Sequence, residues 1–276
     1  MSRVFISDLD HTLLKNDLSI SSFSTNIWND FAKDSIMSIA TARTYKKAIK
    51  FVDKLSLNAP LVLLDGALIA TKDAKIIDTK FIDKTLADEI VNEGFRFGIY
   101  PFILSLANRL SLKERFSYST TLNFHQSEVL KNYKNDDHHD KQDRLIAHDD
   151  NFKIVYFGTK EQIEPLYIHL ESIYKDELKF IFAPEAYAKC YFLTILHKDA
   201  TKAQGIKTIS NHSDFSLDSL TAFGDNLNDI EMFELAKTSV AVANAHKDVK
   251  QKATIVSDFT NDEDSVARYL EGLKDD

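Results

Sequence analysis

The sequence predicts an α/β protein built on a parallel sheet, with a second, α+β domain inserted into the chain. At both ends of the 276 residues, short apolar segments that stop at polar turns alternate with amphipathic stripes at helical spacing. The middle of the chain instead mixes helices with strands and is rich in Tyr and Phe. This length accommodates two domains. We expect a core formed by residues 1–80 and 198–276, and an inserted domain over residues 81–197.

The N-terminal third predicts strand, helix, strand, helix, strand. Val4-Phe5-Ile6 is a short apolar run that suits a strand buried on both faces of a parallel sheet. Helical spacing of apolar side chains predicts helices over 24–33 and 46–55. Residues 35–40 and 61–64 are the next predicted strands.

The rest of the chain divides into an irregular middle and a regular end. The expected strands of the middle are 152–157, 180–182 and 191–196. Between Lys131 and Asp150 the sequence is polar, and we expect an exposed loop. The adjacent His138 and His139 belong to that loop rather than to a metal site. The alternation then resumes with helices over 202–210, 229–236, 249–252 and 264–273, and strands over 220–223, 239–242 and 254–257.

Composition excludes several classes of protein. Lys plus Arg is 34 and Asp plus Glu is 42, a net charge of -8, which argues against a nucleic-acid binder that relies on phosphate neutralisation. The single cysteine excludes intrachain disulfides and Cys-based zinc sites, and it indicates a reducing compartment. Because the sequence carries no apolar segment of signal-peptide or membrane-spanning length, we expect a cytoplasmic protein without membrane association.

Glycine usage restricts how phosphate could be bound. The chain has seven glycines, and none of them completes a phosphate loop, a dinucleotide fingerprint or a nucleophile elbow. Any phosphate chemistry therefore has to use carboxylates, a metal ion and isolated donors.

Polar side chains follow the predicted strands at three places. Asp8 and Asp10 follow the first strand, Thr41 and Arg43 follow the second, and the acidic segment 225–229 follows a C-terminal strand. These side chains should converge, because the carboxyl ends of parallel strands meet at one edge of a sheet. Two carboxylates in a turn can also be a simple helix cap. The second acidic segment favours a site for a hard cation, since converging carboxylates would otherwise repel one another.

The motifs in these segments resemble those of the haloacid dehalogenase superfamily. Its four motifs are matched in order by Asp8-Leu9-Asp10-His11-Thr12-Leu13, Thr41, Lys202 and Gly224-Asp225-Asn226-Leu227-Asn228-Asp229. The second Asp of the first motif is similar to that of the Mg²⁺-dependent phosphatase branch. Leu64-Asp65-Gly66-Ala67-Leu68-Ile69 resembles the Asn-Gly-Ala segment of the Cof-like and sucrose-phosphatase-like subfamily IIB. The resemblance implies a Rossmann-like core with a type-two (C2) cap between the second and third motifs.

The resemblance also implies catalytic and metal-binding roles. Asp8 would be the nucleophile that forms an aspartyl-phosphate, and Asp10 would protonate the leaving alcohol and then activate water. Mg²⁺ would be held by Asp8, Asp225 and the main-chain carbonyl of Asp10. Asp229 would either bind the metal through water or fix Lys202.

Further residues would bind phosphate or support the site. Thr41, Lys202 and Asn228 are implied as phosphate-binding groups. Thr12 would be either a direct contact or a turn hydroxyl. Arg43 would either reach the substrate or pair with an acid.

Three positions depart from the pattern of the resembled family. His11 stands where Gly is common, and His is among the residues that tolerate a positive φ. Ala42 replaces the Gly of a Thr-Gly-Arg turn. Asp65 replaces the Asn of the Asn-Gly-Ala segment and adds a negative charge.

The implied function is a Mg²⁺-dependent phosphatase acting on a small phosphorylated metabolite, with a sugar phosphate as the expected substrate. The inserted domain would exclude water and select the leaving group. Two alternatives stay open: a phosphotransferase such as a phosphohexomutase, and a non-catalytic phospho-acceptor or sugar-phosphate-binding module. We expect a monomer or homodimer.

Overall fold

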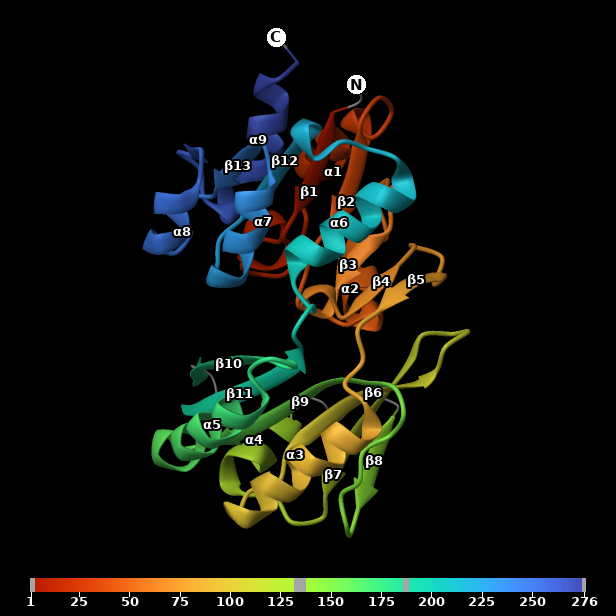
Figure 1. Ribbon diagram of the computed structural model, residues 1–276. Coiled ribbons are helices and arrows are strands. Elements are labelled where there is room, and N and C mark those ends of the chain that lie inside the picture. The colour runs from red at the N-terminus through yellow and green to blue at the C-terminus, as the bar shows by residue number, and fades with distance from the viewer. Residues whose placement is uncertain (1–2, 132–137, 186–188, 275–276) are drawn as a thin grey trace. The chain divides into compact units, whose positions relative to one another are not determined.

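The chain folds into two compact units. The computed structural model describes residues 3–131, 138–185 and 189–274. One unit comprises Met1–Thr79 and Thr201–Asp276, and the other comprises Lys80–Ala200 (Figure 1). Among the described residues, no helix has both the length and the apolar character needed to cross a membrane.

A five-stranded parallel sheet forms the centre of the first unit, as the sequence predicted. Its strand order is β14-β13-β12-β1-β2, with every neighbouring pair parallel. The strands are β1 (Val4–Ser7), β2 (Ile36–Ile39), β12 (Leu220–Gly224), β13 (Thr238–Ala241) and β14 (Ile255–Val256). β1 lies between β12 and β2, so segments from the two ends of the chain pair directly.

Helices cover both faces of this sheet. They are α1 (Ser22–Phe31), α2 (Tyr45–Val52), α6 (Lys202–Ser213), α7 (Ile230–Leu235), α8 (Lys247–Lys252) and α9 (Ser265–Gly272). Ile6 of β1 shares a buried cluster with Ile206 of α6. The next residue back, Phe5, packs its ring against Phe31 of α1 on the opposite face. Burial on both faces explains why β1 is a short, entirely apolar run up to Ser7.

A small antiparallel sheet adjoins the parallel one. It consists of β3 (Leu61–Leu63), β4 (Leu68–Ala70) and β5 (Ile76–Thr79), and a parallel bridge from Ala40 to Val62 connects β3 to the end of β2. Only β3 was predicted. Gly205 lets α6 approach this sheet closely, because a Cβ at that position would lie 2.4 Å from the Val62 side chain.

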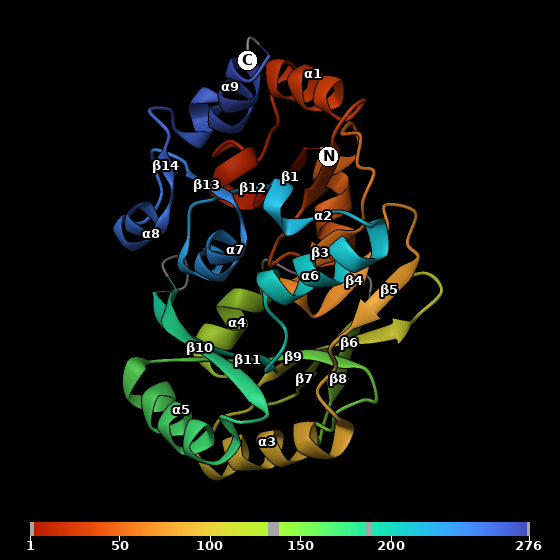
Figure 2. The ribbon, with the colours of Figure 1, turned by 45° about the horizontal axis from the view of Figure 1, so that its top comes forward.

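The second unit is α+β, in agreement with the predicted fold class. Its six-stranded sheet has the order β10-β11-β9-β6-β7-β8. The strands are β6 (Phe102–Asn108), β7 (Lys113–Ser119), β8 (His139–Gln142), β9 (Asn151–Gly158), β10 (Leu178–Glu185) and β11 (Cys190–His197). Its helices are α3 (Lys84–Arg96), α4 (Phe124–Lys131) and α5 (Lys160–Tyr174). α3 and α5 lie side by side over one apolar core (Figure 2).

The predicted loop around the histidine pair was wrong in part. His139–Gln142 form the edge strand β8, which pairs in parallel with β7 and places His139 opposite Phe116. Leu145 and Ala147 are buried in the core of this unit. This polar segment forms a strand because its backbone pairs with β7. The sequence of the segment itself does not indicate that pairing. Residues 132–137 of the predicted loop lie outside the described residues.

Candidate functional site

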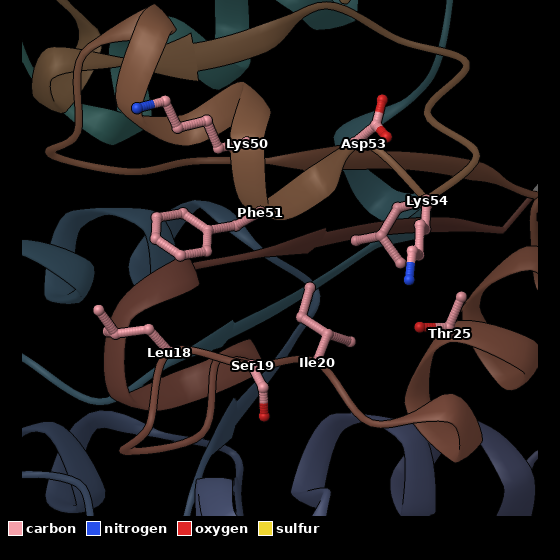
Figure 3. A pocket seen from close by; sticks show the side chains of 9 residues that line it. Leu18, Ser19, Ile20, Thr25, Lys50, Phe51, Asp53 and Lys54 are labelled. Atoms are coloured by element: carbon pink, nitrogen blue, oxygen red, sulfur yellow. The ribbon is translucent and has the colours of Figure 1, made fainter.

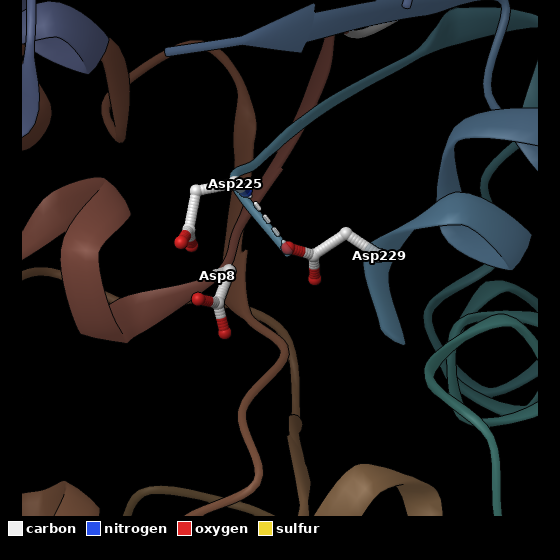
Figure 4. Close-up of side chains that lie close together, drawn as sticks. All are labelled: Asp8, Asp225 and Asp229. Atoms are coloured by element: carbon white, nitrogen blue, oxygen red, sulfur yellow. Dashed lines mark hydrogen bonds between the residues drawn. The ribbon is translucent and has the colours of Figure 1, made fainter. Parts of the chain in front are cut away.

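Three carboxylates meet at the carboxyl edge of the parallel sheet. Asp8 directly follows β1, Asp225 directly follows β12, and Asp229 precedes α7. One oxygen from each lies within 4.8 Å of the others (Figure 4). The structure therefore brings together three of the acidic residues that the sequence placed at this edge.

A wide turn follows β1 and carries the first motif. Leu9–Leu13 form this turn, and His11 adopts a φ of 54°, as expected for a residue replacing glycine there. Asn244 holds the turn by donating from Nδ2 to the main-chain oxygen of His11 at 2.8 Å. Ala42 is not among the described residues with positive φ, so its turn does not need glycine.

Lys202 is a buried cation between two of the carboxylates. It is the first residue of α6 and only 1% exposed. Its Nζ donates to Asp8 Oδ1 and to Asp229 Oδ1, both at 2.6 Å. Burial alone would lower the pKa of Lys202, but the charges of Asp229 and Asp8 outweigh burial and raise it. Lys202 therefore stays charged and neutralises part of the cluster.

Both side-chain oxygens of Asp229 accept hydrogen bonds, from Lys202 and from the turn after β12. Besides the bond to Lys202, its Oδ2 accepts the backbone N–H groups of Asp225 at 2.9 Å and Asn226 at 3.0 Å. Gly224 makes room for this carboxylate, because a Cβ there would lie 2.6 Å from it. Of the two roles implied for Asp229, its contacts match the fixing of Lys202.

The remaining charge of the cluster is poorly neutralised. Burial raises the pKa of Asp8 well above its usual value; Lys202 opposes this, and Asp229 and Asp225 add to it. Burial, and then the charge of Asp229, raise the pKa of Asp225 to about 6. Both shifts arise because ionised carboxylates are costly in a buried, acidic environment.

The donor set fits a hard divalent cation. Thr12 Oγ1 donates to Asp225 Oδ1 at 2.8 Å, and Lys202 occupies Asp8 Oδ1. The Oδ2 atoms of Asp8 and Asp225 receive no hydrogen bond from any residue that the structure describes. Mg²⁺ takes carboxylate oxygens as ligands in proteins. A divalent cation here would also offset the negative charge that, in addition to burial, raises the pKa of Asp8 and Asp225. Thr12 thus orients a candidate metal ligand.

Asp10 is turned onto Arg43 rather than into this cluster. Arg43 Nε donates to Asp10 Oδ2 at 2.7 Å, and Arg43 Nη2 donates to Asp10 Oδ1, which makes a bidentate pair. The guanidinium of Arg43 lies over the Phe51 ring, 4.5 Å from its centre. Of the two roles implied for Arg43, the structure shows the pairing with an acid.

A cavity of about 260 Å³ lies between α2 and the segment that precedes α1 (Figure 3). It is lined by Leu18, Ser19, Ile20, Thr25, Lys50, Phe51, Asp53, Lys54 and Leu55. None of the predicted site residues is among them. One lining residue, Phe51, contacts Arg43 of the site.

Thr41 and Asn228 are linked to each other through Asp65. The main-chain oxygen of the fully buried Thr41 accepts the N–H of Asp65 at 3.0 Å. Asn228 Nδ2 donates to Asp65 Oδ1 at 2.8 Å. Two of the three implied phosphate-binding residues therefore converge on this turn, and the third, Lys202, is bonded to Asp8.

Sequence reasoning did not identify Phe51 and Asn244 as parts of the site. Phe51 belongs to the apolar stripe of α2, where a ring under Arg43 is indistinguishable from a core residue. Asn244 acts on His11 across almost the whole chain. No local signal marks either residue, because each acts through a partner that only the fold supplies.

The raised pKa of Asp225 predicts a pH-dependent response to Mg²⁺. An unfolded carboxyl titrates near pH 4, whereas Asp225 titrates at about 6 in the folded chain, so between these values the folded state binds more protons. The metal-free protein should therefore lose stability as the pH rises through this window, by up to about 3 kcal/mol. Thermal unfolding should show that Mg²⁺ raises the midpoint at pH 7.5 and much less at pH 5. An equal effect at both pH values would contradict a role for Asp225 as ligand.

The chain is similar to a known protein family and to several curated proteins. A family model described as haloacid dehalogenase-like hydrolase matches residues 5–270. The chain is 23% identical over 273 residues to the 5-amino-6-(5-phospho-D-ribitylamino)uracil phosphatase YitU of Bacillus subtilis, covering 95% of this chain and 94% of that protein. It spans 43%, 29% and 44% of the length of three other curated relatives that it matches.

Solved structures show the same fold. The crystal structure of TM0651 from Thermotoga maritima matches with a TM-score of 0.81 and 22% identity, covering 99% of this chain and 97% of that one. The subclass IIB sugar phosphatase BT4131 matches with a TM-score of 0.73 and 20% identity, covering 99% of both chains. At these identities the likeness establishes the fold and leaves the substrate open.

Proposed function

Because the chain belongs to the haloacid dehalogenase-like hydrolase family, we propose that it is a Mg²⁺-dependent phosphatase of a small phosphorylated metabolite. The observation that carries this proposal is the buried Lys202 ammonium bridging Asp8 and Asp229, beside Asp225. This arrangement supports the proposal, because Asp8 would serve as nucleophile next to a buried cation and to carboxylate oxygens suited to a metal. Attack on an anionic phosphate ester is favoured by positive charge that offsets the negative charge of the ester.

The reaction would proceed in two steps on this chain's own residues. Asp8 attacks the phosphorus, the ester P–O bond breaks, and Asp10 gives a proton to the leaving alcohol oxygen. Asp10 then takes a proton from water as the water attacks the aspartyl-phosphate, and inorganic phosphate leaves. Thr41, Lys202 and Asn228 bind the phosphoryl oxygens. Mg²⁺ held by Asp8, Asp225 and the carbonyl of Asp10 would neutralise phosphoryl charge.

Asp10 has to be oriented by Arg43 and yet be able to carry a proton. A bidentate guanidinium fixes the plane of a carboxylate. We infer that Arg43 is a positioning residue for Asp10, and that the pair is loose while Asp10 holds its proton and closes again when donation leaves a carboxylate. The stacking of Arg43 on Phe51 fixes the guanidinium in turn.

Arg43→Lys should therefore affect substrates according to their leaving groups. The value of kcat/KM for an alkyl phosphate should fall about tenfold, because an alkoxide leaves poorly without a well-placed acid. For p-nitrophenyl phosphate, whose leaving group needs little protonation, the fall should be less than about threefold. Steady-state kinetics on the two substrates measure this difference, with Asp10→Asn as the reference for complete loss of the acid. Equal losses on both substrates would contradict an action of Arg43 through Asp10.

We propose a sugar phosphate as the substrate and the unit Lys80–Ala200 as the domain that selects it. The fold likeness to a protein described as a sugar phosphatase supports this choice. A panel of phosphorylated sugars, nucleotides and other metabolites, assayed with Mg²⁺ and with a chelator, tests it. Release of free phosphate supports a phosphatase, whereas an isomerised sugar phosphate would indicate a phosphohexomutase. Binding of Mg²⁺ and phosphate without turnover on any substrate would indicate a non-catalytic module.

A further inference from the structure

Asp65 connects the turn after β3 to the proposed phosphate-binding residues. Leu64 and Asp65 both adopt left-handed backbone conformations, with φ of 51° and 56°. This turn lets the Asp65 N–H reach the Thr41 oxygen at 3.0 Å and lets its Oδ1 accept the Asn228 amide at 2.8 Å. The residue's backbone and its side chain therefore hold two different phosphate-binding positions.

The next residue ties the same turn to α6. Gly66 has a φ of 100°, and a Cβ there would lie 2.2 Å from the main-chain oxygen of Thr201. Thr201 caps the first turn of α6 through Gln204 N, and Lys202 follows it. The turn that carries Asp65 is thus packed directly against the backbone that positions Lys202.

Asp65 also adds charge to the site. It is one of the carboxylates, with Asp229 and Asp8, that raise the pKa of Lys202 against the lowering effect of burial. A carboxylate only accepts hydrogen bonds, so Asp65 fixes the Asn228 side chain with its NH₂ group toward the turn. An asparagine at this position would form the same contact without the charge.

The charges of the named side chains do not balance around a metal ion. Asp8, Asp225 and Asp229 carry three negative charges when ionised, and Lys202 carries one positive charge. One divalent cation would make that set neutral. Asp65 then adds one negative charge that this set does not neutralise, and it lies next to Asn228, which would bind the phosphate.

We propose that Asp65 is a positioning residue that also sets the site's preference between cation and anion. It orients Asn228, strengthens the binding of Mg²⁺, and weakens the binding of inorganic phosphate, which promotes release of the product. This inference rests on the proposed function, because it assigns a consequence to phosphate binding at Thr41, Lys202 and Asn228.

Asp65→Asn tests the proposal with almost no change of shape. Asn tolerates the left-handed conformation and keeps a side-chain oxygen for Asn228. Isothermal titration calorimetry would measure the Kd of Mg²⁺ alone, and then the Kd of inorganic phosphate at saturating Mg²⁺. We expect phosphate to bind about tenfold more tightly and Mg²⁺ about threefold more weakly, as loss of one nearby negative charge requires. The opposite signs identify a charge effect, because a merely structural role would weaken both.

Asp34→Asn is the matched control. Asp34 is exposed in the same unit and precedes β2, whereas the candidate site follows the carboxyl ends of the strands. It should leave both Kd values unchanged, and the thermal midpoints of the two variants should match the wild type. Weaker binding of both ligands to Asp65→Asn, or no change in either Kd, would overturn the inference. The proposed phosphatase function would still stand if the wild-type protein turns over a substrate. A wild-type protein that neither binds phosphate with Mg²⁺ nor hydrolyses any ester would overturn the proposed function and the inference with it.

Discussion

Replacing Asp8 with Asn should abolish phosphatase turnover, lowering kcat by at least about 10⁴-fold. The amide has nearly the same shape but is a poor nucleophile and gives no stable phosphoryl intermediate. Phosphate release from the best substrate of the panel measures the loss. Acid quenching of the wild-type enzyme with a ³²P-labelled substrate should trap a labelled chain that the variant does not form.

Stability should change in the other direction for the same substitution. Burial and the neighbouring carboxylates raise the pKa of Asp8 well above its usual value, so its ionised form destabilises the metal-free folded chain at neutral pH. Asn removes that charge and still accepts from Lys202. The thermal midpoint without Mg²⁺ should therefore stay equal or rise at pH 7.5. Full activity of a folded Asp8→Asn protein would refute the nucleophile assignment.

Replacing Lys202 with Met should produce the largest loss of stability, about 3–5 kcal/mol in the free energy of unfolding. The ammonium is buried and bonded at 2.6 Å to each of two carboxylates, which the substitution leaves buried without their cation. Activity should be lost as well. Urea unfolding at pH 7.5 measures the effect, which should shrink toward pH 5 because the Asp8 carboxyl, whose pKa burial raises, takes up a proton.

Lys207→Met is the control for the loss of one lysine from α6. Lys207 is exposed on the same helix, so its replacement should change stability by less than about 0.5 kcal/mol. Mg²⁺ should restore part of the stability of the Lys202 variant, since it supplies positive charge to the same carboxylates. A Lys202→Met protein as stable as the wild type would contradict the view that the ammonium neutralises the cluster.

The sequence was sufficient to predict the parallel strands and the edge at which their polar turns meet. β1, β2 and β12 are short, largely buried runs, and polar residues follow each of them, as Asp8 follows β1. Such features depend on local pattern and on a general rule of sheet geometry.

The sequence was insufficient where a residue's structure depends on a partner from elsewhere in the chain. His139–Gln142 become a strand only because β7 offers an edge, and β4 and β5 are short strands without a distinctive pattern. In the site, the same holds for the choice of Asp10 as partner of Arg43 and of Lys202 as partner of Asp229. The sequence left open whether Arg43 pairs with an acid and whether Asp229 fixes Lys202, and spacing along the chain does not decide either question.

The position of β1 between β12 and β2 has a consequence for how the protein is made. Val4 pairs with Leu220 on one side and with Ile36 on the other, so the parallel sheet joins β1 to a strand that leaves the ribosome much later. Contacts so distant in sequence form slowly, whereas Lys80–Ala200 is one uninterrupted stretch with its own core. We expect the inserted unit to fold during synthesis, while one edge of β1 stays unpaired, and in need of chaperone protection, until β12 has been synthesised.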